Sequence, residues 1–187
     1  RRPAASTGMR AIRAGVASAR PPRDIPCMGP ALLIAALAAA APLFAIGSET
    51  WWGLAPCALC LWQRWPYWVA AALAVLGVAV PGRARAVLLG LAGLAALVTA
   101  GIGALHVGVE QGWWPSPLPG CQAPTAGGAG GSIDDMMRSL AAAPSKPCDA
   151  ATYLIPGLPV SMAAMNLVYG LGLGALALLA AKRLARA

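Results

Sequence analysis

Long apolar stretches alternate with short polar segments along the chain. Four such stretches, at residues 30–47, 62–81, 86–109 and 160–181, hold a single charged residue between them, Arg64. A helix rises about 1.5 Å per residue, so about 20 residues cross the roughly 30 Å hydrocarbon layer of a membrane. The pattern therefore predicts an all-α membrane protein built as a four-transmembrane-helix bundle.

The first apolar stretch also has a second reading, as a cleavable signal peptide. Ala45-Ile46-Gly47 is a small-x-small sequence of the kind that precedes a cleavage site. The apolar run is longer than most signal-peptide cores, so we expect a retained helix that contains Pro42.

The segment between the third and fourth stretches, residues 110–159, has a different character. It combines prolines and a glycine-rich run with Ser132-Ile133-Asp134-Asp135, a capping-box pattern. Apolar residues then recur at helical spacing, at Ile133, Met136, Met137 and Leu140. We expect a short amphipathic helix that lies flat in the membrane interface.

Composition agrees with a membrane protein, since 59% of the residues are hydrophobic and 11% charged, with a mean hydropathy of +0.68. The net charge of +8 does not indicate nucleic-acid binding, because the basic residues flank apolar stretches and no basic patch is interleaved with aromatic residues. Of 14 Lys and Arg, 11 lie in residues 1–29, 83–85 and 182–187. The positive-inside rule places these three segments in the cytoplasm, with residues 1–29 as a disordered tail. Loops 48–56 and 110–159 then face outward.

Two of the five cysteines form a Cys-x-x-Cys pair, Cys57 and Cys60, at the start of the second stretch. On a helix, Cys57, Cys60 and Arg64 form one stripe. A helix N-terminus stabilises a thiolate, which is the reactive form of cysteine. A disulfide across so short a loop stabilises a fold only weakly, so we favour redox chemistry over a structural bridge.

The remaining cysteines are Cys27, on the inner side, and Cys121 and Cys148, which share the outward loop 27 residues apart. Taken alone, the last two are best read as a structural disulfide. Beside an outward Cys-x-x-Cys pair, however, they can exchange with it through mixed disulfides. A zinc site of all four outward thiolates is a weaker alternative, since such sites normally have two close pairs, and we expect no bound metal.

Arg64, His106, Trp62 and Trp65 are the candidate residues around this pair. Arg64 is either an interfacial arginine reaching the headgroups or a cation that favours the Cys60 thiolate and holds a lipid-soluble acceptor. His106, the chain's single histidine, is either a satisfied interface residue or part of the acceptor pocket. The two tryptophans flank the cysteine stripe and could form the wall for a planar ring.

Gly170 and Gly174 have the small-xxx-small spacing of close helix contacts. In a chain with 22 glycines, composition alone is the more economical explanation.

Together these features resemble the DsbB family of bacterial disulfide-bond formation proteins. The resemblance rests on Cys57-Ala-Leu-Cys60-Leu-Trp-Gln-Arg64, the second cysteine pair, the four spans and Pro115-Ser116-Pro117 before Cys121. It covers about residues 30–181, with tryptophan in place of the commoner tyrosine at position 62.

The resemblance implies a multi-pass enzyme of the bacterial inner membrane with cytoplasmic termini and periplasmic redox loops. Such an enzyme reoxidises a periplasmic DsbA-like thioredoxin-fold protein and reduces a membrane quinone, either ubiquinone or menaquinone. By that likeness Cys121 forms the mixed disulfide with the partner, Cys148 resolves it, and Cys57/Cys60 pass electrons to the quinone. Cys60 and Arg64 would lie nearest the quinone, and His106 is close to the place of a quinone-associated histidine.

Two other classes of protein remain open from the residues. A vitamin-K-epoxide-reductase-like enzyme has similar chemistry, but its Cys-x-x-Cys lies near the last span. A non-enzymatic membrane protein could carry both cysteine pairs as structural disulfides.

Overall fold

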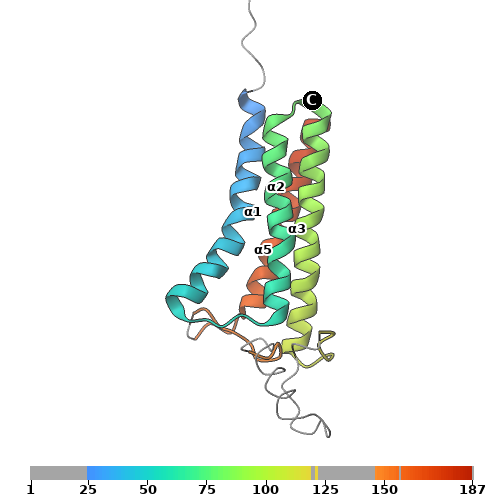
Figure 1. Cartoon of the computed structure of the whole chain (residues 1–187). Helices are drawn as coiled ribbons and strands as arrows, with labels where there is room; N and C mark the ends of the chain where they lie inside the picture. The colour runs from blue at the N-terminus through green and yellow to red at the C-terminus, as the bar shows by residue number, and fades with distance from the viewer. Residues whose placement is uncertain (1–24, 119–120, 122–145, 156, 187) are drawn as a thin grey trace, which may run out of the picture.

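The computed structural model describes residues 25–118, 121, 146–155 and 157–186. Figure 1 shows four long helices side by side, with successive helices running in opposite directions. They are α1 (Ile25–Trp52), α2 (Ala58–Ala79), α3 (Gly82–Glu110) and α5 (Met162–Arg186). The all-helical prediction is confirmed for this part of the chain, where the remaining pairing is an isolated bridge between Tyr153 and Ser161. The amphipathic helix expected at Ile133–Leu140 lies outside the described residues.

Three of the helices are long and apolar enough to cross a membrane: α1 from Met28 onward, α3 and α5. The fourth, α2, has 22 residues, which corresponds to about 33 Å. Its first half carries Gln63, Arg64 and Pro66 among aromatic residues, and these lower its hydropathy. The three apolar helices establish a membrane protein.

The first helix continues to Trp52, beyond the expected end of the first span at residue 47. Ser48 and Thr50 donate hydroxyl hydrogen bonds to backbone carbonyls one turn earlier, Ser48 to Ala45 at 2.7 Å and Thr50 to Gly47 at 3.0 Å. The two hydroxyl groups at this end are therefore satisfied within the helix. Gly53, with φ of 64°, reverses the chain toward α2.

A tight turn at Pro81 and Gly82 joins α2 to α3. The buried Arg85 guanidinium reaches back to the end of α2, where its Nε donates to the carbonyls of Gly77 (2.9 Å) and Val80 (3.0 Å). These carbonyls have no partner within their own helix. Arg85 therefore satisfies these carbonyls and places a positive charge at this end of the bundle.

Small residues let α3 and α5 approach closely. A Cβ atom added at Gly170 would lie 3.1 Å from the backbone nitrogen of Ala100, and one at Gly174 would lie 3.2 Å from the carbonyl oxygen of Gly93. Composition is therefore the wrong explanation for the Gly170/Gly174 spacing, because both glycines are required by the α3–α5 contact. In a membrane such close contacts supply much of the attraction between helices.

The second half of α1 slants away from α2 and α5 in Figure 1. Pro42 lies in the middle of α1, and a proline removes one helical hydrogen bond and bends a helix. α3 thus packs closely against both α2 and α5, while α1 diverges from the other helices toward the end where α2 begins (Figure 1).

We predict that Gly170→Leu destabilises the protein by about 1–3 kcal/mol, because overpacking forces α3 and α5 apart. Gly172→Leu is the matched control on the same helix, since nothing lies within 4 Å of a Cβ at Gly172. Thermal unfolding in detergent should give a lower midpoint for Gly170→Leu only. Equal midpoints for the two variants would contradict the contact.

Candidate redox site and adjoining cavity

The Cys-x-x-Cys pair forms the N-terminus of α2. Cys57 is the N-cap residue, and its Sγ accepts a hydrogen bond from the Cys60 backbone N–H at 3.2 Å. Both cysteines are free thiols, and the Cys57 thiol donates to the Cys60 sulfur at 2.9 Å. The two sulfurs are thus in direct contact, in a position to form or open a disulfide.

This contact makes the two thiols unequal. The hydrogen bond from Cys57 is the main reason that the pKa of Cys60 is lowered to about 7, with a smaller contribution from the positive charge of Arg64. The same hydrogen bond, together with burial, raises the pKa of Cys57. Cys60 is therefore the more acidic thiol of the pair, and Cys57 is the one that keeps its proton.

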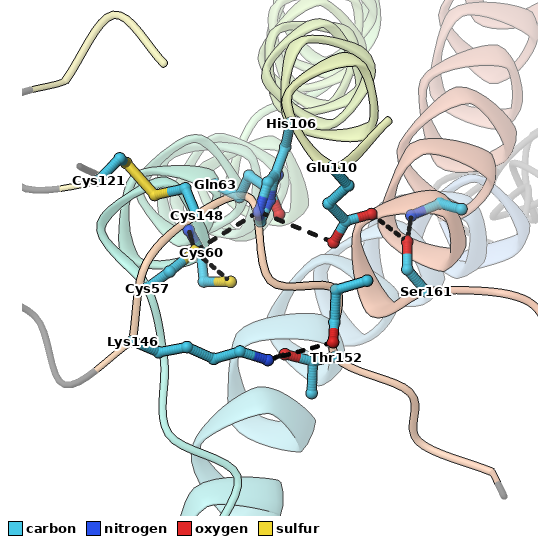
Figure 2. A network of polar contacts seen from close by, with 12 residues as sticks. Cys57, Cys60, Gln63, His106, Glu110, Cys121, Lys146, Cys148, Thr152 and Ser161 are labelled. Carbon is cyan, nitrogen blue, oxygen red and sulfur yellow. Dashed lines mark hydrogen bonds and ion pairs between the residues drawn. A yellow bond between two sulfur atoms is a disulfide. The ribbon is translucent and has the colours of Figure 1, made fainter. Parts of the chain in front are cut away.

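The second pair, Cys121 and Cys148, forms a disulfide with a Cα–Cα distance of 4.8 Å. It packs in one buried cluster with Cys57, Leu59 and Val109, and Figure 2 shows it next to the Cys57/Cys60 pair. The structure thus brings together the two pairs that the sequence places far apart. The alternative zinc site of four thiolates is not assembled, because two of the four sulfurs are joined in this bridge.

A buried polar network connects Cys57 to α3 and α5 (Figure 2). His106 Nε2 lies 3.5 Å from the Cys57 sulfur, and His106 Nδ1 lies 3.1 Å from the Gln63 amide. Glu110, one turn along α3, lies 3.9 Å from His106 and accepts a hydrogen bond from the Ser161 hydroxyl. The side chains of His106 and Glu110 are each only 3% exposed.

Lys146 fixes the chain that follows Cys148. Its Nζ donates to the Thr152 hydroxyl at 2.6 Å and to the Ala151 carbonyl at 3.2 Å. The backbone carbonyl of Thr152 accepts a hydrogen bond from the Met162 N–H at the start of α5. The segment carrying Cys148 is thereby held against the bundle.

A cavity of about 370 Å³ opens beside Cys60, between α1, α2 and α5. Its wall is mainly apolar, with polar side chains at one end. Its lining residues include Glu49, Cys60, Arg64, Tyr67 and Asn166.

Two hydrogen-bond donors of this wall have no partner in the described part of the chain: Arg64 Nε and Asn166 Nδ2. Arg64 uses another nitrogen to pair with Glu49 at the end of α1. Asn166 uses its oxygen to accept the Tyr67 hydroxyl at 2.9 Å. Buried donors of native proteins are normally satisfied, so unpaired donors beside a cavity indicate a missing acceptor.

The four residues expected from the sequence to surround the cysteines do not form one group in the structure. Arg64 lines the cavity, whereas His106 contacts Cys57 and is separated from the cavity by Gln63, which lines the wall and contacts the ring. Trp62 and Trp65 are 58% and 72% exposed and are not part of the cavity wall.

Sequence reasoning missed Asn166, Tyr67 and Glu110 as members of the site. Asn166 carried a usable signal, because a polar amide in an otherwise apolar span is costly and commonly functional. Glu110 stands four residues after His106, the spacing of neighbours on one helix face.

A helical membrane bundle with a thiolate–thiol pair, a second disulfide packed against it and an adjoining cavity defines a membrane-embedded thiol–disulfide protein. The family model described as "Disulfide bond formation protein DsbB" matches residues 29–180. The chain belongs to this family, that of membrane oxidoreductases of disulfide-bond formation. No curated protein and no solved structure matches the chain.

For the thiol pair we predict that Cys60 is alkylated as a thiolate, with a half-maximal rate near pH 7 when Cys57 and Cys60 are reduced. Cys57→Ala removes the thiol that stabilises this thiolate, so the Cys60 pKa rises toward its ordinary value of about 8.5. At pH 7 a smaller fraction is then ionised, and alkylation slows by about tenfold.

Peptide mass spectrometry across a pH series gives the rate at Cys60 alone. Cys57→Ser is the matched comparison, because its hydroxyl still donates, and it should move the midpoint less. A Cys57→Ala profile identical to that of the unaltered protein would contradict the role of this hydrogen bond.

Proposed function

We propose that the protein is a thiol:quinone oxidoreductase that reoxidises a periplasmic DsbA-like thioredoxin-fold protein and passes the electrons to a membrane quinone. The observation that carries this proposal is the position of Cys60. It is a stabilised thiolate that lines a cavity with unpaired donors, while its partner Cys57 packs in one cluster with a second disulfide.

The two cysteine pairs provide a route for two electrons. The reduced partner attacks the Cys121–Cys148 disulfide and leaves oxidised, with its two electrons in the Cys121/Cys148 dithiol. That dithiol then reduces a Cys57–Cys60 disulfide by exchange, since all exchange of this kind proceeds through mixed disulfides. The burial of Cys57, Cys121 and Cys148 in one cluster supports this second exchange.

The cavity fits a quinone ring. Quinones are flat, apolar molecules with two carbonyl acceptors, and the wall offers apolar surface with Arg64 Nε and Asn166 Nδ2 as unused donors. A bound quinone supplies an acceptor for two electrons and two protons. Cys60 would deliver the electrons, and Arg64 and Asn166 would hold the ring. The second half of α1, including Pro42 and Phe44, forms part of the cavity wall, which supports entry from the bilayer beside this helix.

The proposed topology has four spans, with α2 as the fourth. α2 packs against both α1 and α3. The start of α1, the turn between α2 and α3 and the end of α5 lie at one end of the bundle, and α2 begins at the other (Figure 1). The first of these ends carries Arg83, Arg85, Lys182, Arg183 and Arg186. By the positive-inside rule this end is cytoplasmic. The cysteine end then faces the periplasm of the bacterial inner membrane, where disulfides persist.

We predict that Cys57→Ser and Cys60→Ser each abolish quinone reduction by a reduced thioredoxin-fold protein. The reason is that neither variant can form the disulfide that accepts and releases the electron pair. The measurement is the loss of quinone absorbance, with purified protein and a short-chain ubiquinone.

Cys27→Ser is the control for the loss of a sulfur atom. It should retain full turnover, because Cys27 lies at the start of α1, and the Cys57/Cys60 pair follows the other end of this helix. Full turnover by Cys57→Ser or Cys60→Ser would rule the relay out.

The cavity donors lead to a separate prediction. Arg64→Gln and Asn166→Leu should raise the KM for the quinone about tenfold each, because a lost hydrogen bond to a carbonyl costs about 1–1.5 kcal/mol. Val168→Leu on the exposed face of α5 is the control and should leave KM unchanged. An unchanged KM in both cavity variants would place the quinone elsewhere.

A further inference from the structure

Closing the Cys57–Cys60 disulfide requires the loss of two thiol protons. One leaves when Cys60 becomes a thiolate, in the state that its lowered pKa favours. The other stays on Cys57, whose thiol points at the Cys60 sulfur at 2.9 Å. Since Cys57 is only 3% exposed, this second proton needs an acceptor within the protein.

His106 is placed to accept it. Its Nε2 lies 3.5 Å from the Cys57 sulfur, within the range of a sulfur hydrogen bond. The ring is buried and held from the other side by Gln63. An amide can serve both protonation states of the ring, because it donates through its nitrogen or, rotated, accepts the Nδ1–H through its oxygen. In the second arrangement the Nε2 lone pair faces Cys57.

Glu110 completes the set of charged groups around the ring. Its carboxylate lies 3.9 Å from Nε2 on the same helix and is anchored by the Ser161 hydroxyl of the segment that begins α5. Cys57 and Cys60 face His106 from the start of α2, and the Cys148 backbone hydrogen-bonds the ring. Lys146, in the loop before Cys148, acts on both His106 and Glu110 through its positive charge. An acid beside the imidazole offsets this lysine and stabilises a protonated ring.

We propose that His106 accepts the Cys57 proton when the Cys57–Cys60 disulfide closes, and that Glu110 is the positioning residue that stabilises the protonated imidazole. In this step the S–H bond of Cys57 breaks, the Cys57–Cys60 bond forms and the proton moves to His106 Nε2. The two electrons go to the quinone. Its full reduction also takes up two protons, and the two thiols together release two protons, so the step balances. The inference rests on the proposed function and gives His106 a role at the thiol, apart from the cavity.

The test measures quinone reduction by fully reduced, full-length protein after rapid mixing with a short-chain ubiquinone, over a pH series. His106→Ala should lower the maximal rate about 10²–10⁴-fold, the usual contribution of a general base, with an unchanged KM for the quinone. Added imidazole should restore part of the rate in His106→Ala, because the shortened side chain leaves room for it. His106→Gln keeps the bulk of the side chain and should be slow without rescue.

Glu110→Gln tests the positioning role. The rate rises with pH as Cys60 becomes a thiolate and as neutral imidazole becomes available to accept the Cys57 proton. Glu110 also acts directly on Cys60, so Glu110→Gln is measured both alone and combined with His106→Ala. Loss of the carboxylate should move the rise to lower pH by more when His106 is present than when it is absent. Asp149→Asn, the same change at an exposed carboxylate beside Cys148, should leave the profile in place.

A raised KM with an unchanged maximal rate in His106→Ala would overturn the inference, because His106 would then bind the quinone. A loss of rate without imidazole rescue, or a Glu110→Gln shift that is no larger with His106 than without it, would also overturn it. Failure of the unaltered protein to reduce the quinone would instead overturn the proposed function.

Discussion

The hydrogen bond from the Cys57 thiol to the Cys60 sulfur is the interaction on which the site depends. It divides one proton unequally between two thiols and leaves Cys60, one turn before Arg64, as the thiolate. A thiolate exchanges disulfides and reduces acceptors, whereas a thiol does neither at a useful rate. Helix geometry creates this asymmetry, because the N-cap sulfur accepts the Cys60 N–H and is thereby held against its partner.

The packing of the bundle decides what the thiolate can reach. Glycines at the α3–α5 contact bring these helices close together, and the Thr99 hydroxyl of α3 bonds the Gln63 carbonyl of α2. α3 is thus fixed against α5 on one side and α2 on the other, which holds His106 of α3 against Cys57 at the start of α2. α1 packs mainly on α2, and its divergence after Pro42 leaves the cavity beside Cys60. The two thiols therefore have different neighbours, because Cys57 contacts His106 whereas Cys60 lines the cavity.

Much of the fold followed from the sequence, because uncharged runs of helical length have few alternatives in a membrane. The cysteines and Arg64 were found from their spacing alone. The contacts of His106 with Cys57 and of Asn166 with Tyr67 were not, since both join residues from different helices and depend on how the helices are rotated. The Gly170/Gly174 spacing was misjudged for the same reason, because spacing along one helix does not reveal which neighbour its face meets.

Buried polar groups are expensive in a membrane bundle, and most of those in the described part of this chain lie at one end. Gln63, His106 and Ser161 are buried there together with the Glu110 side chain, while the core below them is mainly alanine and leucine. Apolar residues would hold these helices together at lower cost in desolvation. The polar network at the N-terminus of the helix that carries the thiol pair therefore costs more than an apolar contact would, as is common for groups that serve a site rather than the fold. The apolar core of the bundle gives it a rigid and dry support.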